Sequence, residues 1–154
     1  MIEEKLVNIL IEKGYTISSA ESCTGGLFAG TIVNVPNASK VFNSSVVTYS
    51  NEAKQKYCNV SIETLKAYGA VSEETAFEMA KGIAIECNSN IGVGITGIAG
   101  PGGATPTKPV GMVCFGFNVN GKITTSTMIF SGDRQTVRKS SVEYAMTKLI
   151  ELLS

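Results

Sequence analysis

A short segment of small and hydroxyl-bearing residues stands between a predicted strand and a predicted helix, where residues 20–26 are AESCTGG. Side chains at this place lie at the carboxyl edge of the sheet, where open α/β folds bind ligands. Free amides at a helix start can hold an anion, and Gly25 and Gly26 let a ligand approach the backbone. Ser22 is therefore a candidate nucleophile. The alternative is that Ser22 or Thr24 only caps the helix.

Cys23 is a rival nucleophile, because thiolates react well at helix N-termini. Adjacent residues leaving a strand point in different directions, so only one of Ser22 and Cys23 is expected to face the cleft. The sequence leaves this choice open.

The sequence contains no histidine, which excludes Ser-His-Asp and Cys-His catalysis within one chain. A serine nucleophile then needs lysine, tyrosine or a carboxylate as its base. Tyr49 ends a predicted strand and Lys54 lies on the following turn, and parallel strands that end at one edge would bring both near Ser22. A desolvated lysine loses proton affinity and can act as a base. The alternative is a solvated Lys54 and a Tyr49 that only packs.

The segment TGIAGPGG, residues 96–103, follows a predicted buried strand and reaches the same edge. Glycine-dense turns expose successive amides and bind anions. The segment contains neither GxxxxGK[ST] nor GxGxxG, which disfavours a kinase or a dinucleotide dehydrogenase.

Arg134 and Arg138 stand one helical turn apart at the start of the last predicted helix. Two guanidinium groups beside a helix N-terminus could bind a phosphate. They could instead pair only with Asp133 or with surface acids.

Strand and helix patterns alternate along the chain and end in a hairpin. Strands are predicted at 15–20, 46–49, 91–95, 110–118 and 122–130, and helices at 6–13, 27–33, 51–57, 61–69, 72–87 and 133–153. The dipeptide Asn120-Gly121 is a strong signal for a hairpin turn. The pattern predicts an α/β fold: one three-layer α/β/α sandwich with a mixed, mostly parallel sheet.

The composition limits the classes of function. Thirteen basic residues balance thirteen acidic ones, so no overall field favours nucleic acid or an anionic membrane. No signal peptide or membrane span is recognisable, which predicts a cytoplasmic protein. The four scattered cysteines suggest no zinc site, and neither a metal nor another cofactor is expected.

Three segments in order, AESCTGGL (20–27), VVTYSNEAK (46–54) and TGIAGPGG with KPVG (96–103 and 108–111), resemble the CinA C-terminal domain family. That family includes nicotinamide mononucleotide deamidases, and the resemblance extends over nearly the whole chain. Cys58-Asn59 and Met112 depart from its usual residues at peripheral positions. The resemblance implies a single amidohydrolase domain over residues 1–154.

The activity implied by the resemblance is hydrolysis of the carboxamide of nicotinamide mononucleotide to nicotinate mononucleotide and ammonia. Ser22 would be the nucleophile, Lys54 its base, and Tyr49 an accessory proton carrier or orienting group. The residues that would bind substrate are Thr24, Gly25, Gly26, Thr96, Gly97, Gly100, Gly102, Arg134 and Arg138, of which the two arginines rest mostly on their spacing and place at the helix start rather than on the resemblance.

Two other functions stay open. The protein could be a nucleotide-binding regulatory module without turnover, linked to competence or DNA damage, or a serine-lysine amidase or peptidase for another substrate. The expected partner is a small mononucleotide, with neither nucleic acid nor membrane, and a homo-oligomer stays open.

Overall fold

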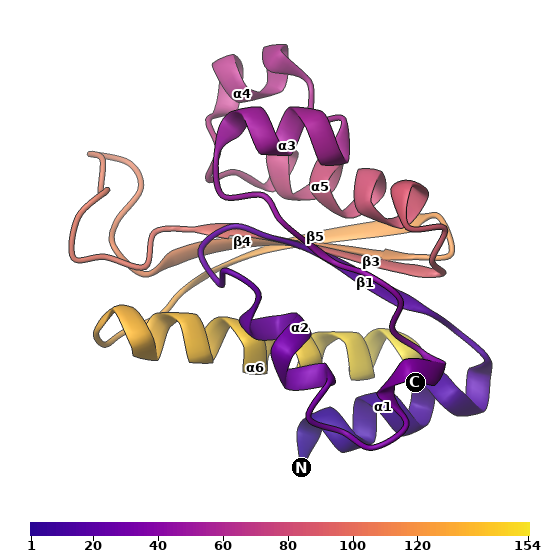
Figure 1. Cartoon of the computed structure of the whole chain (residues 1–154). Coiled ribbons are helices and arrows are strands. Elements are labelled where there is room, and N and C mark those ends of the chain that lie inside the picture. Colours follow the sequence, from indigo (N-terminus) through magenta and orange to yellow (C-terminus); the bar gives the residue numbers. More distant parts are fainter.

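The computed structural model describes all residues from Met1 to Ser154. Five strands form one sheet, and helices cover both of its faces (Figure 1). The elements in chain order are α1 (Ile2–Lys13), β1 (Ile17–Glu21), α2 (Leu27–Ile32), the 3-10 helix η1 (Ala38–Lys40), β2 (Val46–Val47), α3 (Asn51–Cys58), α4 (Ile62–Tyr68), α5 (Glu73–Glu86), β3 (Ile91–Gly97), β4 (Met112–Val119), β5 (Lys122–Ile129) and α6 (Arg134–Leu153).

The strand order in the sheet is β2-β1-β3-β4-β5. Strand β1 pairs in parallel with β2 and β3, whereas the β3–β4 and β4–β5 pairs are antiparallel. The predicted hairpin turn is present, with Asn120 and Gly121 both at positive φ, as a two-residue turn of this kind requires. The predicted α/β fold with a mixed sheet is confirmed, and its parallel part is the half made by β2, β1 and β3.

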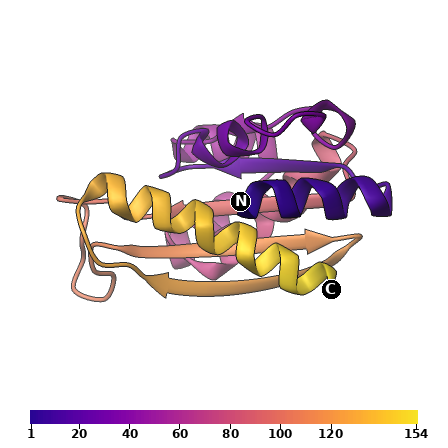
Figure 2. The ribbon, with the colours of Figure 1, turned by 90° about the horizontal axis from the view of Figure 1, so that it is seen from below.

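Helices α3, α4 and α5 lie on one face of the sheet, and α1, α2 and α6 lie on the other (Figure 1). Figure 2 shows α1 and α6 side by side across the second face. On the first face α5 approaches the sheet closely, because Gly94 of β3 carries no side chain. A Cβ there would lie 2.6 Å from the carbonyl oxygen of Ala76 in α5.

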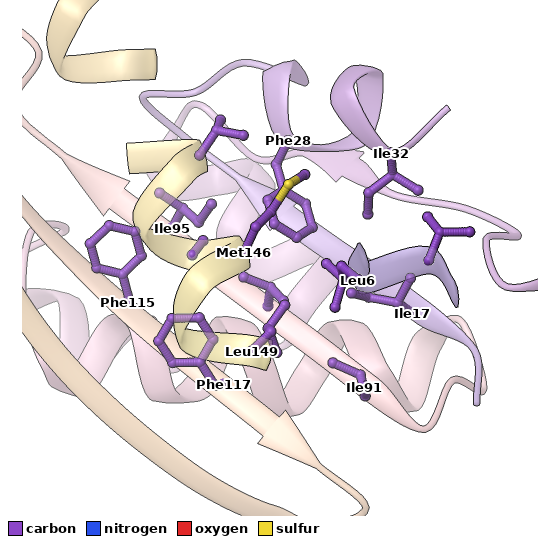
Figure 3. Packing of buried hydrophobic residues seen from close by; sticks show 14 of the residues in the cluster. Leu6, Ile17, Phe28, Ile32, Ile91, Ile95, Phe115, Phe117, Met146 and Leu149 are labelled. Atoms are coloured by element: carbon purple, nitrogen blue, oxygen red, sulfur yellow. The ribbon is translucent and has the colours of Figure 1, made fainter. Parts of the chain in front are cut away.

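The larger hydrophobic core fills the space between the sheet and the layer of α1, α2 and α6 (Figure 3). Its labelled side chains come from both sides, with Phe115 and Phe117 on β4 facing Met146 and Leu149 on α6. The core therefore fixes α6 to the sheet along most of its length. No helix combines the length and the apolar character that crossing a bilayer requires.

Two of the strand ends that differ from the prediction change which residues lie at the candidate site. Strand β2 has two residues rather than four, and the carbonyls of Thr48 and Tyr49 bond to the Lys54 Nζ instead of to a strand. Strand β3 continues to Gly97, so Thr96 and Gly97 belong to the sheet and not to the loop.

Candidate functional site

The carboxyl ends of β1, β2 and β3 meet at one edge of the sheet. Ser22 follows β1, and its amide donates to the Ile95 carbonyl of β3 at 2.9 Å. The Thr48 amide, after β2, donates to the Glu21 carbonyl at 2.9 Å. Figure 1 shows the loop that follows β3 and the first turn of α6 at the same end of the sheet. Segments far apart in sequence are therefore gathered around Ser22.

Lys54 lies under this edge, and its side chain is almost completely buried, with 1% of the residue exposed. Its Nζ lies 3.2 Å from the Ser22 Oγ, 2.9 Å from the Thr48 carbonyl oxygen and 3.2 Å from the Tyr49 carbonyl oxygen. No carboxylate pairs with it, since the two ion pairs in the molecule are Met1–Glu4 and Lys148–Glu151. The alternative of a solvated Lys54 is therefore wrong.

Burial lowers the pKa of Lys54 below its ordinary value of 10.5, because the charged ammonium is desolvated. Negative charge on the Cys23 and Cys58 thiols would oppose this shift. Burial raises the pKa of each of these thiols to about 12, so both are neutral near pH 7. At neutral pH these two thiols therefore carry no negative charge that would oppose the lowering of the Lys54 pKa.

The side chain of Cys23 packs differently from that of Ser22. The residue is 5% exposed and its side chain belongs to the larger hydrophobic core. Burial raises the pKa of this thiol to about 12, which keeps it protonated and weakly nucleophilic. Of the two neighbours, Ser22 is the one that lies beside a buried amine.

The start of α2 is occupied by a carboxylate of the protein itself. The buried Glu21 side chain accepts hydrogen bonds from the Phe28 amide at 2.8 Å and the Ala29 amide at 3.0 Å, and from the Ser19 hydroxyl at 3.0 Å. Neither Ser22 nor Thr24 caps the helix. The expected anion site at this helix start is therefore corrected: Glu21 already supplies the negative charge that the helix N-terminus favours.

A cavity of about 270 Å³ opens at the sheet edge beside Ser22. Eight of the predicted site residues line it: Ser22, Tyr49, Lys54, Thr96, Gly97, Gly100, Gly102 and Arg134. Six further residues complete its wall: Cys23, Ala70, Val71, Ile98, Ala99 and Gly103. The residues gathered from the three sequence segments therefore surround a single space.

The glycine-rich loop presents unpaired amides to this region. The N–H groups of Ala99, Gly100, Gly102 and Gly103 have no acceptor in the protein. Arg134 connects the loop to Tyr49, because its guanidinium donates to the Gly100 carbonyl at 2.9 Å and to the Tyr49 hydroxyl at 3.1 Å. Amides and a guanidinium together can bind an anion.

Four predicted substrate-binding residues do not line the cavity: Thr24, Gly25, Gly26 and Arg138. Thr24 is fully buried, and its Oγ1 has no hydrogen-bond partner. Gly25 and Gly26 have positive φ values of 56° and 99° and form the turn into α2. Arg138 donates to the carbonyls of Cys23 and Thr24 rather than facing the cavity, and neither Arg134 nor Arg138 forms an ion pair.

Sequence reasoning missed Glu21 and the apolar part of the wall. Glu21 directly precedes Ser22, and an acid just before a helix start is a signal for bonds to the free helix amides. Ala70 and Val71 lie between α4 and α5, and Thr96 holds this segment by donating to the Ala70 carbonyl at 2.8 Å. Only the folded chain shows that they reach the cavity.

A larger cleft of about 550 Å³ lies between α3 and α5, away from Ser22. Cys58 is its only nucleophilic side chain besides exposed lysines and Tyr57, and burial raises the pKa of that thiol to about 12. The smaller cavity, with Ser22 and Lys54, is therefore the better candidate for chemistry. No group of three or more His, Cys, Asp or Glu side chains is placed to hold a metal ion.

Comparison with known proteins agrees with the motifs and the fold. A CinA-like protein from Kosmotoga olearia is 54% identical over 145 residues, which is 94% of this chain and 35% of that protein. The chain thus spans about a third of the length of the curated relatives it matches.

Solved structures are also similar to this chain in fold. The crystal structure of a competence-damaged protein (CinA) superfamily protein from Enterobacter cloacae has a TM-score of 0.96 at 37% identity, covering 99% of this chain and 90% of that one. A competence/damage inducible protein from Agrobacterium tumefaciens has a TM-score of 0.93 at 38% identity, covering 100% and 97%. The model of the CinA C-terminal domain matches residues 1–153. The chain therefore belongs to the CinA C-terminal domain family.

Proposed function

We propose that this protein is a serine-lysine amidohydrolase that removes the carboxamide nitrogen of nicotinamide mononucleotide. One observation carries the proposal: the Lys54 Nζ is buried without a carboxylate partner and lies 3.2 Å from the Ser22 Oγ, at the wall of a cavity. Burying a lysine costs free energy, because the charged ammonium loses its water. A buried lysine with a lowered pKa is therefore a candidate for a functional group that acts in its neutral form.

Three acceptor oxygens surround the Lys54 Nζ, which an ammonium satisfies with three N–H donors and which a neutral amine can also use. A neutral amine has two N–H donors and one lone pair, and Lys54 has two backbone carbonyls and one hydroxyl as neighbours. With its N–H groups donated to Thr48 and Tyr49, the lone pair is left for the Ser22 hydroxyl proton. The base and the nucleophile are then in hydrogen-bond contact before substrate arrives.

The reaction follows from this contact. The Ser22 Oγ attacks the carboxamide carbon while its proton passes to Lys54. The Lys54 ammonium then gives that proton to the leaving nitrogen, so ammonia departs and an ester on Ser22 remains. Water adds to the ester with Lys54 again as base, which releases the carboxylate product. The charge that develops on the carbonyl oxygen can be met by the Cys23 amide, which has no acceptor in the protein and belongs to a residue of the cavity wall.

The substrate class follows from the wall and from the family resemblance. Ala70, Val71 and Ile98 offer an apolar surface for a flat ring. Arg134 and the unpaired loop amides offer donors for a phosphate. Tyr49 is 60% exposed, and its hydroxyl accepts from Arg134, so we assign it an orienting part at the mouth of the cavity.

The test is release of ammonia from nicotinamide mononucleotide by the purified protein, with a panel of other primary amides and peptides beside it. The proposal expects turnover of the mononucleotide above the other compounds. Binding of the mononucleotide without ammonia would instead identify a regulatory module, and faster hydrolysis of another amide would replace the substrate while keeping the chemistry.

A further inference from the structure

We propose that Arg138 is a positioning residue for the turn that carries Ser22, and that it acts on the backbone rather than on substrate. This inference rests on the proposed function for its catalytic consequence. The structural part stands on its own contacts and can be measured separately.

Arg138 holds two successive carbonyls of the turn. Its Nε donates to the Cys23 carbonyl at 3.0 Å, and its second terminal nitrogen donates to the Thr24 carbonyl at 2.9 Å. A guanidinium presents fixed, nearly parallel N–H groups, which suits two acceptors side by side. A lysine ammonium is a compact point charge and does not reproduce this planar geometry.

These bonds determine where the neighbouring amides point. In a trans peptide the C=O and N–H groups point in opposite directions. Holding the Cys23 carbonyl toward Arg138 therefore turns the Thr24 N–H away from it. On the other side of Cys23, the Gly25 amide donates to the Ser22 carbonyl at 3.0 Å, which directs the Cys23 N–H away from Gly25. Both amides, Cys23 and Thr24, lack an acceptor in the protein.

The anchor behind Arg138 is rigid. Its neighbour Val137 and, one turn on, Ser141 are fully buried, and the Ser141 hydroxyl donates to the Val137 carbonyl at 2.7 Å. Helix α6 is packed into the larger core further along as well, through Met146 and Leu149 (Figure 3). Because Arg138 belongs to this packed helix, its hydrogen bonds fix the peptide after Cys23 relative to the core.

The charge of Arg138 adds to this positioning. A cation bound to a peptide carbonyl polarises that peptide and strengthens the N–H at its other end as a donor. The guanidinium lies close enough to favour the charged form of the Cys23 thiol, although burial outweighs it. The two polarised peptides end in the N–H groups of Thr24 and Gly25, and the Gly25 N–H holds the Ser22 carbonyl. Loss of Arg138 should therefore loosen the turn, and with it the orientation of the Cys23 amide expected to meet the developing oxyanion.

The experiment compares Arg138→Met and Arg138→Lys with Lys139→Met, which removes an exposed lysine next to Arg138 that makes no hydrogen bond or ion pair. For Arg138→Met we expect kcat to fall on the order of 10²-fold, as for a small misplacement of reacting groups. KM should change little, Arg138→Lys should recover little of the rate, and Lys139→Met should behave as the wild type. A normal kcat in Arg138→Met, or full recovery by lysine, would overturn the proposal.

A second substrate separates positioning from phosphate binding. The same loss of kcat on the riboside, which lacks the phosphate, supports positioning. A rise in KM confined to the phosphate-bearing substrate would assign Arg138 to phosphate binding instead.

Hydrogen exchange tests the inference without any substrate. The bonded amides of Ser22, Gly25 and Leu27 should exchange at least about tenfold faster in Arg138→Met than in Lys139→Met, while those of the buried part of α6 should not change. Unchanged exchange in the turn would overturn the inference. If the wild type releases no ammonia, the proposed function fails, and this measurement still decides whether Arg138 holds the turn.

Discussion

Replacing Lys54 with methionine should change how the stability of the protein depends on pH. Burial lowers the pKa of Lys54 in the folded state below the 10.5 of the unfolded chain. Between these two values the unfolded state binds more protons than the folded state, so the wild type gains stability as pH rises. Below the folded pKa and above 10.5 this contribution to the slope disappears.

The magnitude follows from one proton. A single group contributes at most about 1.4 kcal/mol of unfolding free energy per pH unit inside the window. The difference in unfolding free energy, wild type minus Lys54→Met, should therefore be constant at low pH. It should rise by up to about 1.4 kcal/mol per pH unit inside the window and become constant again above pH 10.5. Loss of the bonds to Thr48 and Tyr49 shifts the whole difference curve but not its slope.

Urea unfolding at 25 °C across pH 6 to 10 (~1-unit steps) measures this difference. Lys56→Met is the matched control, since Lys56 is exposed on the same helix, and it should keep the slope of the wild type. A difference curve for Lys54→Met that stays flat up to pH 10 would show that Lys54 keeps an ordinary proton affinity. The general-base assignment would then have no support from burial.

Two further predictions test the site and its framework. Lys54→Arg keeps the positive charge but cannot accept a proton, so its kcat should fall at least about 10²-fold, as in Lys54→Met; a near-normal rate in the ammonia assay would move the base to Tyr49. Gly82→Ala should destabilise the fold by about 1–3 kcal/mol in urea unfolding, because a Cβ there would overlap the Cys58 carbonyl oxygen. Its control, Gly30→Ala, meets open space in α2 and should leave stability unchanged or raise it by up to about 1 kcal/mol; equal effects of the two would contradict the packing argument.

The fold was accessible from the sequence because its periodicities are local. Strands β3, β4 and β5 and helices α5 and α6 lie within a few residues of their predicted bounds. The prediction was weakest at β2, where a lysine side chain takes the carbonyls that would have extended the strand. That competition depends on α3 folding back over β2, which no local pattern encodes.

Part of the candidate site could also be predicted from the sequence. Ser22 and Lys54 follow β1 and β2, and Thr96 lies at the end of β3, so the shared strand direction brought them to one edge. The functions of the charged groups around them were harder to predict. Glu21 bonds to amides in the first turn of α2, whereas Arg138 bonds to the carbonyls of Cys23 and Thr24 in the turn before it. The Arg138 contacts depend on where α6, from the other end of the chain, is packed. The residue types of Glu21 and Arg138 indicated that these side chains are charged, but not which backbone groups they bond to.

The measurement that tests the central claim most directly is ammonia release from nicotinamide mononucleotide by Ser22→Ala and Cys23→Ala side by side. The serine-lysine mechanism predicts that Ser22→Ala loses at least ~10³-fold in kcat, as removal of a nucleophile does, while Cys23→Ala keeps most of the rate. The mechanism assigns no part to the Cys23 thiol, because burial raises its pKa to about 12. An active Ser22→Ala beside an inactive Cys23→Ala would contradict the mechanism.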